Sequence, residues 1–205
     1  MEKETFYKRF QQELPGVSAH EAFAPYRKNF EHLAENQRKK AAVGIHFYPE
    51  ANELFFILIE RSTYDGKHSG QMAFPGGKPE ESDLHLECTA RRESEEELSI
   101  PTHSGDLVGQ LTNVWIPVSS FEVTPFVFFH DRKPEIEINT YEVANYFSVR
   151  LAELLSNESM SSTTIQVNEQ LNMKDIPCFI LQGKIVWGAT ALMLNELRMV
   201  LKVTD

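Results

Sequence analysis

The spacing of apolar positions changes about 40 residues into the chain. Before that point, Phe6, Tyr7, Phe10 and Leu14 recur at helical spacing among charged residues, and Pro15–Gly16 ends the run. After it, short runs rich in Val, Ile and Phe predict β-strands. The predicted strands, the last of them a hairpin, cover residues 41–48, 53–60, 106–115, 121–130 and 176–188.

Two further helices are predicted within this second part. One spans residues 83–98, is rich in acidic side chains and stops near Pro101, and the other spans residues 189–202 with its apolar positions on one side. The polar run at 156–164 predicts a loop. Strands flanked by helices indicate an α/β (α+β) fold with a mixed sheet between helices. We therefore expect a helical extension at 1–40 and a main domain at 41–205.

The charge of the chain limits the classes of partner. Its 205 residues carry a net charge of −10 at pH 7, with an ordinary globular share of 41% hydrophobic and 24% charged residues. An acidic chain without a basic stripe is a poor candidate for binding nucleic acid or an anionic membrane. An anionic substrate would need a bridge between two negative surfaces, and a divalent metal ion supplies one.

The chain also carries no visible targeting or membrane segment. Its first ten residues lack the apolar stretch of a signal peptide, and the longest apolar run, LFFILI, is too short to span a bilayer. Cys88 and Cys178 are far apart and form no CxxC pattern, which is typical of a reducing compartment. These features predict a soluble cytoplasmic protein, and they leave a homodimer open.

The run RRESEEELS at 91–99 places four glutamates within five positions. At about 100° per residue, Glu96 and Glu97 fall about 60° and 40° to either side of Glu93, whereas Glu95 lies on the opposite side. Three carboxylates on one face suit Mg²⁺, which takes oxygen ligands. The alternative is a solvated helix face paired with neighbouring arginines, and the run by itself does not decide. Because Gly76–Gly77 lets the backbone approach a metal or phosphate just before this helix, the combination predicts a metal-dependent phosphate site.

These residues together resemble the Nudix box, G-x5-E-x7-R-E-U-x-E-E-x-G-U, in which U is aliphatic. The matching positions are Gly77, Asp83, Arg92, Glu93, Glu96, Glu97 and Ile100. The match includes one extra residue before the arginine and Asp in place of the first Glu. Ser94 and Ser99 stand where an aliphatic residue and Gly are usual. The resemblance implies a Nudix-type α/β/α sandwich.

The segment Ile59–Gly77 is similar to a signature that precedes the box in one branch, the coenzyme A diphosphatases: R-S-x-x-L-R-x-H-x-G-Q-V-x-F-P-G-G. The matching positions are Arg61, Ser62, His68, Gly70, Gln71, Phe74, Pro75, Gly76 and Gly77. The whole resemblance covers about residues 40 to 200. One departure is Asp65–Gly66, where the branch has Leu-Arg with an arginine suited to a substrate phosphate, and Lys67 follows at the next position.

The resemblance also implies roles for individual residues. Glu93, Glu96 and Glu97 would hold Mg²⁺ or Mn²⁺, and Arg92 would orient Glu93 by a charge-assisted hydrogen bond. Gly77 would add its carbonyl as a metal ligand. Glu142 matches a downstream acid that would be a further ligand or the catalytic base, with a surface-loop carboxylate as the alternative. The implied substrate-binding residues are Arg61, Lys67, His68, Gln71 and Gly76.

The implied reaction is hydrolysis of a diphosphate linkage in a small nucleoside diphosphate substrate. With coenzyme A or acyl-CoA, the products would be adenosine 3′,5′-bisphosphate and (acyl-)4′-phosphopantetheine. A Nudix hydrolase of another substrate, such as ADP-ribose or a dinucleotide, is the alternative that Asp65–Gly66 keeps open. A non-catalytic ligand-binding module and a plain acidic helix without metal are the remaining alternatives.

Overall fold

The computed structural model describes residues 1–24, 37–62, 70–168 and 171–202. Its helices are α1 (Lys3–Phe10), α2 (Val17–Phe23), α3 (Leu86–Leu98), α4 (Leu151–Leu155) and α5 (Gly188–Leu201), with a 3-10 turn at Asn157–Ser159. Its strands are β1 (Lys39–Glu50), β2 (Glu53–Arg61), β3 (Met72–Ala73), β4 (Gly76–Gly77), β5 (Asp106–Gln110), β6 (Val114–Ile116), β7 (Phe121–Phe129), β8 (Val143–Arg150), β9 (Met160–Asn168), β10 (Leu171–Leu181) and β11 (Lys184–Val186).

The long strands β1, β2 and β7 form the middle of a mixed sheet. The main strand order is β3-β2-β1-β7-β5, with β4 paired to β1, β6 to β7 and β8 to β2. The β1–β7 pair is parallel, and the other pairs of this sheet are antiparallel. A second sheet has the order β11-β10-β9. Two short strands, β3 and β4, carry the glycine-rich segment to the edge of β1, where Ala42 lies opposite Gly77.

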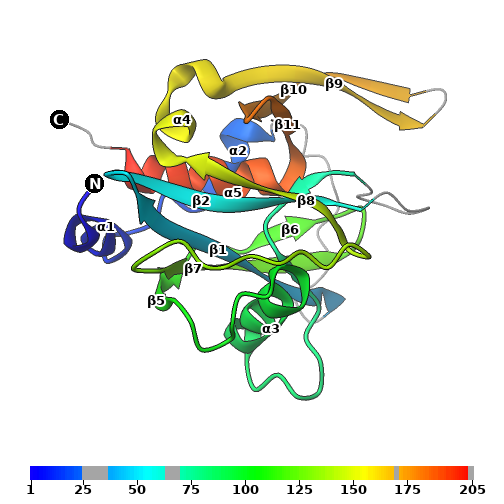
Figure 1. Cartoon of the computed structure of the whole chain (residues 1–205). Coiled ribbons are helices and arrows are strands. Elements are labelled where there is room, and N and C mark those ends of the chain that lie inside the picture. The colour runs from blue at the N-terminus through cyan, green and yellow to red at the C-terminus, as the bar shows by residue number, and fades with distance from the viewer. Residues whose placement is uncertain (25–36, 63–69, 169–170, 203–205) are drawn as a thin grey trace.

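Successive side chains of β1 point to opposite faces of the sheet, as strand geometry requires. Ala42 packs with Ala90 of α3 and Phe128 of β7, whereas Ile45 and Phe47 belong to the larger core that includes α5. Figure 1 shows α3 and α5 on opposite sides of the sheet. This arrangement confirms the predicted fold, a mixed sheet between helices.

The N-terminal helices pack against the main domain. The buried ring of Phe6 on α1 lies 4.8 Å from Phe47 and 5.3 Å from Phe129, centroid to centroid. On α2, the Ala19 carbonyl accepts a hydrogen bond of 2.8 Å from Asn195 Nδ2 of α5. Both helices therefore add to the core, while the division of the chain at residue 40 stays a prediction.

Glu196 of α5 links α2 to the segment between β5 and β6. Its buried carboxylate accepts hydrogen bonds from Thr112 Oγ1 at 2.7 Å and Gly16 N at 3.3 Å, and it lies 3.0 Å from His20 Nε2. Because Glu196→Ala would leave these buried or partly buried groups without their acceptor, we expect it to lower the free energy of unfolding by about 3 kcal/mol in urea titrations. The exposed Glu158→Ala is the control, and equal effects of the two changes would contradict the assignment.

Two predictions about local structure differ from the observed elements. The helix expected from residue 83 begins at Leu86, after an extended N-cap residue, His85. The loop expected at 156–164 is wrong in its second half, because β9 begins at Met160 and pairs with β10. The β-branched residues from Thr163 onward favour a strand, and pairing with β10 outweighs the polarity of the segment. Among the described residues, no helix combines the length and the apolar character needed to cross a membrane.

Candidate active site

The glycine pair of β4 brings the backbone against α3. Gly76 has a φ of +155°, and a Cβ there would lie 2.3 Å from the Ala42 carbonyl oxygen. A Cβ on Gly77 would lie 2.2 Å from Glu93 Oε1. A side chain at Gly76 would therefore collide with the backbone of β1, whereas one at Gly77 would displace the Glu93 carboxylate. This contact places the Gly77 backbone beside an acidic side chain.

Three carboxylates converge beside this loop. Glu93 and Glu97 come from α3, and Glu142 comes from the turn before β8. Each offers one carboxylate oxygen, and these oxygens all lie within 4.8 Å of one another. Gly76 N donates to the Glu97 carboxylate oxygen Oε2 at 2.9 Å, and Ser62 N holds the backbone of Glu142 by donating to its main-chain carbonyl at 2.8 Å.

The burial of this cluster makes its negative charge costly. Burial raises the pKa of Glu97 to about 8, although the Arg61 guanidinium and the Gly76 N–H act in the opposite direction. Burial also raises the pKa of Glu93, against the lowering effect of Arg92. The neighbouring carboxylates, including Glu142, raise both values further. Three hard oxygen donors that favour added positive charge fit a divalent cation such as Mg²⁺ or Mn²⁺.

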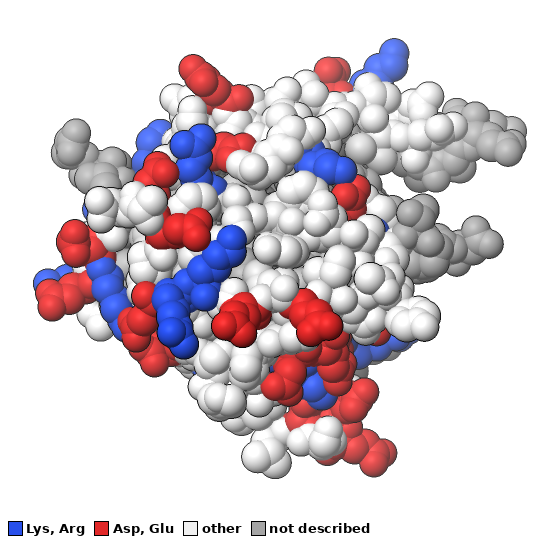
Figure 2. All heavy atoms as spheres, in the orientation of Figure 1, with Lys and Arg blue, Asp and Glu red and all other residues white. Residues whose placement is uncertain are grey.

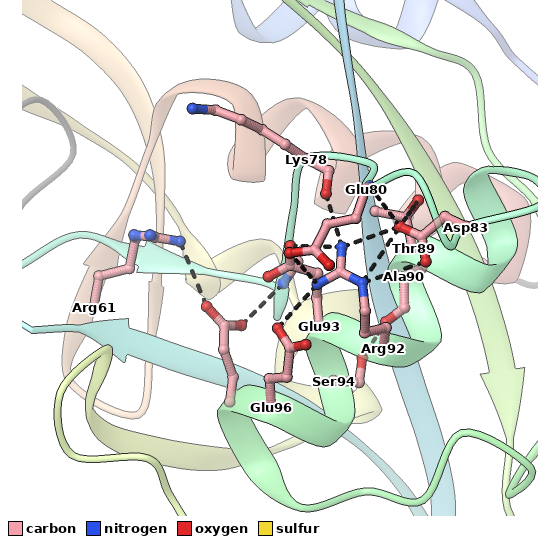
Figure 3. A network of polar contacts seen from close by, with 12 residues as sticks. Arg61, Lys78, Glu80, Asp83, Thr89, Ala90, Arg92, Glu93, Ser94 and Glu96 are labelled. Carbon is pink, nitrogen blue, oxygen red and sulfur yellow. Dashed lines mark hydrogen bonds and ion pairs between the residues drawn. The ribbon is translucent and has the colours of Figure 1, made fainter.

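Arg92 connects the segment before α3 to the cluster (Figure 3). Its Nη2 donates to Asp83 Oδ2 at 3.1 Å, to the Lys78 carbonyl at 2.8 Å and to Glu93 Oε1 at 3.2 Å. Its Nη1 donates to Glu96 Oε2 at 2.9 Å. The hydrogen bond from Arg92 also lowers the pKa of Asp83. Arg92 is therefore held in place by four acceptors, one of them Glu93.

The glutamates of the acidic run have different surroundings. Glu96 pairs with Arg92 and keeps 48% of its side chain exposed, so it lies outside the group of three converging carboxylates. Glu95 is exposed and accepts a hydrogen bond from Thr102 N at 3.2 Å. Figure 2 shows acidic side chains gathered over the lower part of the molecule, where Figure 1 places α3. The assignment of Glu96 as a metal ligand stays a prediction.

The predicted substrate-binding residues are only partly described. Arg61 lies at the end of β2 with its Nη1 3.7 Å from Glu97 Oε1, and its buried Nε has no hydrogen-bond partner among the described residues. Gln71 lies beside it, since Arg61 N donates to the Gln71 carbonyl at 3.1 Å. Lys67 and His68, like Asp65–Gly66, lie outside the described residues. A partly buried arginine whose Nε has no partner among the described residues suits an anionic ligand at this edge of the cluster.

Two contacts of the site had no signal in the sequence. They are the Gly76 N–H that binds Glu97 and the Lys78 carbonyl that binds Arg92. Both groups belong to the backbone, which carries the same donor and acceptor at nearly every position. Only the fold determines which backbone groups meet the acidic helix.

Comparison with known proteins agrees with this geometry. The NUDIX domain profile matches residues 38–168. The chain is 32% identical over 195 residues to the uncharacterized Nudix hydrolase NudL of Yersinia pestis (strain Pestoides F), covering 94% of this chain and 91% of that protein. NudL of Yersinia pseudotuberculosis serotype O:1b (strain IP 31758) gives the same values.

Two solved structures share the fold at low sequence identity. The Nudix hydrolase RenU of M. smegmatis aligns with a TM-score of 0.51 and 14% identity, over 82% of this chain and 90% of that one. A MutT/nudix family protein of Enterococcus faecalis aligns with a TM-score of 0.50 and 11% identity, over 98% and 72%. With the profile and the relatives, these findings show that the chain belongs to the Nudix family and is a Nudix pyrophosphohydrolase.

Proposed function

We propose that the enzyme hydrolyses the diphosphate linkage of coenzyme A or acyl-CoA, with Mg²⁺ or Mn²⁺ as its cofactor. The observation that carries the diphosphate chemistry is the convergence of Glu93, Glu97 and Glu142 beside the Gly76–Gly77 loop. The preference for coenzyme A is supported by the similarity of the segment Ile59–Gly77 to the signature of coenzyme A diphosphatases.

The proposed metal ligands are Glu93 and Glu97, with Glu142, the Gly77 carbonyl and Glu96 as further candidates. A divalent metal, when bound, neutralises phosphate oxygens and lowers the pKa of a water molecule. Nudix hydrolases in general use such ions. The converging carboxylates of this chain supply the hard oxygen donors that these ions require.

The side chains in and around the cluster have different proposed roles in the reaction. Water attacks one phosphorus in line, the bond to the bridging oxygen breaks, and a phosphate monoester leaves. Glu142 is the most exposed member of the cluster and is our candidate to accept the proton of that water, with Glu93 as the alternative. Arg92 holds Glu93 in position, and Arg61 is placed to bind a phosphate oxygen.

A second substrate class is favoured by one departure from the signature. Asp65–Gly66 replaces the Leu-Arg pair of the coenzyme A diphosphatases, so an arginine suited to a substrate phosphate is absent from that position. The alternative is therefore a Nudix hydrolase of another nucleoside diphosphate derivative, such as ADP-ribose or a dinucleotide. The proposed substrate is a small molecule in either case, and a homodimer stays a proposal.

A substrate panel with Mg²⁺ tests this choice. We expect turnover of coenzyme A, with adenosine 3′,5′-bisphosphate and 4′-phosphopantetheine identified by mass spectrometry, and loss of turnover when the metal is chelated. Product identification reports the substrate and the cleaved bond together. Rapid hydrolysis of ADP-ribose with no turnover of coenzyme A would overturn the proposed substrate and support the alternative.

A further inference from the structure

The buried side of α3 carries a polar group where the family pattern has an aliphatic residue. Ser94 follows Glu93 directly and is 0% exposed. Its hydroxyl lies against His46 of β1, which in turn contacts His130 just after β7, and the two histidines are 2% and 6% exposed. A hydroxyl and two imidazoles buried behind the acidic face require hydrogen-bond partners, and each finds one within this group.

The distances define one direction for this hydrogen-bonded chain. Ser94 Oγ donates to the Ala90 carbonyl at 2.7 Å, so it accepts from His46 Nε2 at 2.8 Å. His46 Nδ1 is then an acceptor, and it receives a hydrogen bond from His130 Nε2 at 2.9 Å. Burial lowers the pKa of His46 well below its usual value and that of His130 to about 4. Both imidazole rings are therefore neutral, so that each hydrogen bond of the series has one donor and one acceptor.

Two glycines leave the space that the side chains of Ser94, His46 and His130 occupy. A Cβ on Gly44 would lie 2.7 Å from His46 Nε2 and 2.8 Å from Ser94 Oγ. A Cβ on Gly105 would lie 2.7 Å from His130 Cε1. The surrounding backbone thus fits these three side chains closely, and it leaves them little freedom to move.

The same strand also holds the glycine loop of the active site. Gly44 N, two residues before His46 on β1, donates to the Pro75 carbonyl at 2.9 Å. The next residue of that loop, Gly76, donates to Glu97 of α3 at 2.9 Å. The contacts therefore close a ring that runs from β1 through Ser94 and α3 to Glu97, and back through the loop to β1.

We propose that His46 is a positioning residue for the acidic cluster, acting through its hydrogen bonds to Ser94 and His130. It fixes the rotation and the axial position of α3, and thereby the places of Glu93 and Glu97 relative to the Gly76–Gly77 loop. This inference rests on the proposed function, since it assigns to the hydrogen bonds of His46 a role in aligning the proposed metal ligands.

Helix geometry explains why such a contact matters. A slip of α3 by one residue would turn its side chains by about 100°, which is enough to move a carboxylate off the face it shares with its partners. Apolar contacts such as that of Ala90 with Ala42 are non-directional and resist such a shift weakly. A hydrogen bond from a fixed imidazole depends on distance and angle, so it distinguishes one placement of the helix from the others.

The test compares His46→Phe, which keeps a ring but removes both hydrogen bonds, with His46→Gln, which keeps an N–H donor for Ser94. The matched control is His20→Phe, because His20 is also buried and paired, but with Glu196 on the other side of the sheet. Three quantities are measured in the folded proteins: Mn²⁺ affinity by titration calorimetry, hydrogen exchange of the Gly76 amide in metal-free protein, and kcat with KM for the substrate that the panel identifies.

We expect His46→Phe to weaken Mn²⁺ binding and to lower kcat by about tenfold each, as loss of an outer-shell support does, with KM little changed. Its Gly76 amide should exchange faster, and His46→Gln should restore all three quantities in part. His20→Phe should lower stability alone. If His46→Phe loses stability but keeps the wild-type affinity and amide exchange, the positioning role is overturned. A wild type without hydrolytic activity would refute the proposed function, and the metal and exchange measurements would still decide this inference.

Discussion

Glu97→Gln should lower metal-dependent diphosphate hydrolysis at least about 100-fold. Loss of an outer-shell partner of a metal ligand already costs about 10- to 100-fold, and Glu97 is proposed as a ligand itself. The substitution removes one negative charge from the group formed with Glu93 and Glu142, while an amide oxygen can still accept the hydrogen bond from Gly76 N. The fold should survive, so the loss should appear in kcat and in Mn²⁺ affinity at unchanged secondary structure.

Glu95→Gln is the matched control for this prediction. It makes the same chemical change on the same helix, but its side chain is exposed and accepts a hydrogen bond from Thr102 N, away from the cluster. We expect hydrolysis by this variant to stay within about twofold of the wild type, as for other surface substitutions. Unchanged hydrolysis in Glu97→Gln, or equal losses in both variants, would show that Glu97 is not a metal ligand.

The periodicity of the acidic run explains why part of the cluster was predictable. Rotation by about 100° per residue places Glu93 and Glu97 on one side of the helix and Glu95 on the other, and the structure shows this separation. The angle alone also places Glu96 beside Glu93. The angle takes no account of Arg92, one turn before Glu96, which donates a hydrogen bond of 2.9 Å to the Glu96 carboxylate.

Other parts of the site depend on contacts between distant segments. Glu142 could be singled out by its resemblance to a family position, but its approach to Glu93 depends on the pairing of β8 with β2. His46 and His130 gave no pattern, because they are separated by 84 residues and meet only where β1 and β7 run side by side. The local sequence does not predict strand β9 for the same reason, since its partner β10 supplies the hydrogen bonds that a polar segment lacks by itself.

Glu97 should also make the metal-free protein less stable as the pH rises. Its pKa of about 8 in the folded protein lies above the ordinary value of 4.5 expected in the unfolded chain. Between these two values the folded state binds a proton that the unfolded state has released, so folding stability falls with increasing pH. The raised pKa of Glu93 acts in the same direction. At 1.36 kcal/mol per pKa unit, the contribution of Glu97 lost across the whole window is roughly 5 kcal/mol.

Glu97→Gln should remove most of this dependence, because the amide is neutral at every pH in the window. In urea titrations of chelator-treated protein, we expect the variant to match the wild type near pH 5 and to exceed its free energy of unfolding by roughly 3 to 4 kcal/mol near pH 8.5. Glu95→Gln should follow the wild-type curve.

Excess Mn²⁺ should stabilise the wild type at high pH and the variant far less, because a bound cation replaces the proton that burial favours. Parallel curves for Glu97→Gln and the wild type in the absence of metal would contradict the raised pKa. If Glu97→Gln is more stable than the wild type without metal and yet inactive, the buried carboxylate of Glu97 costs folding stability and is needed for activity. That result would support its role in the proposed metal site.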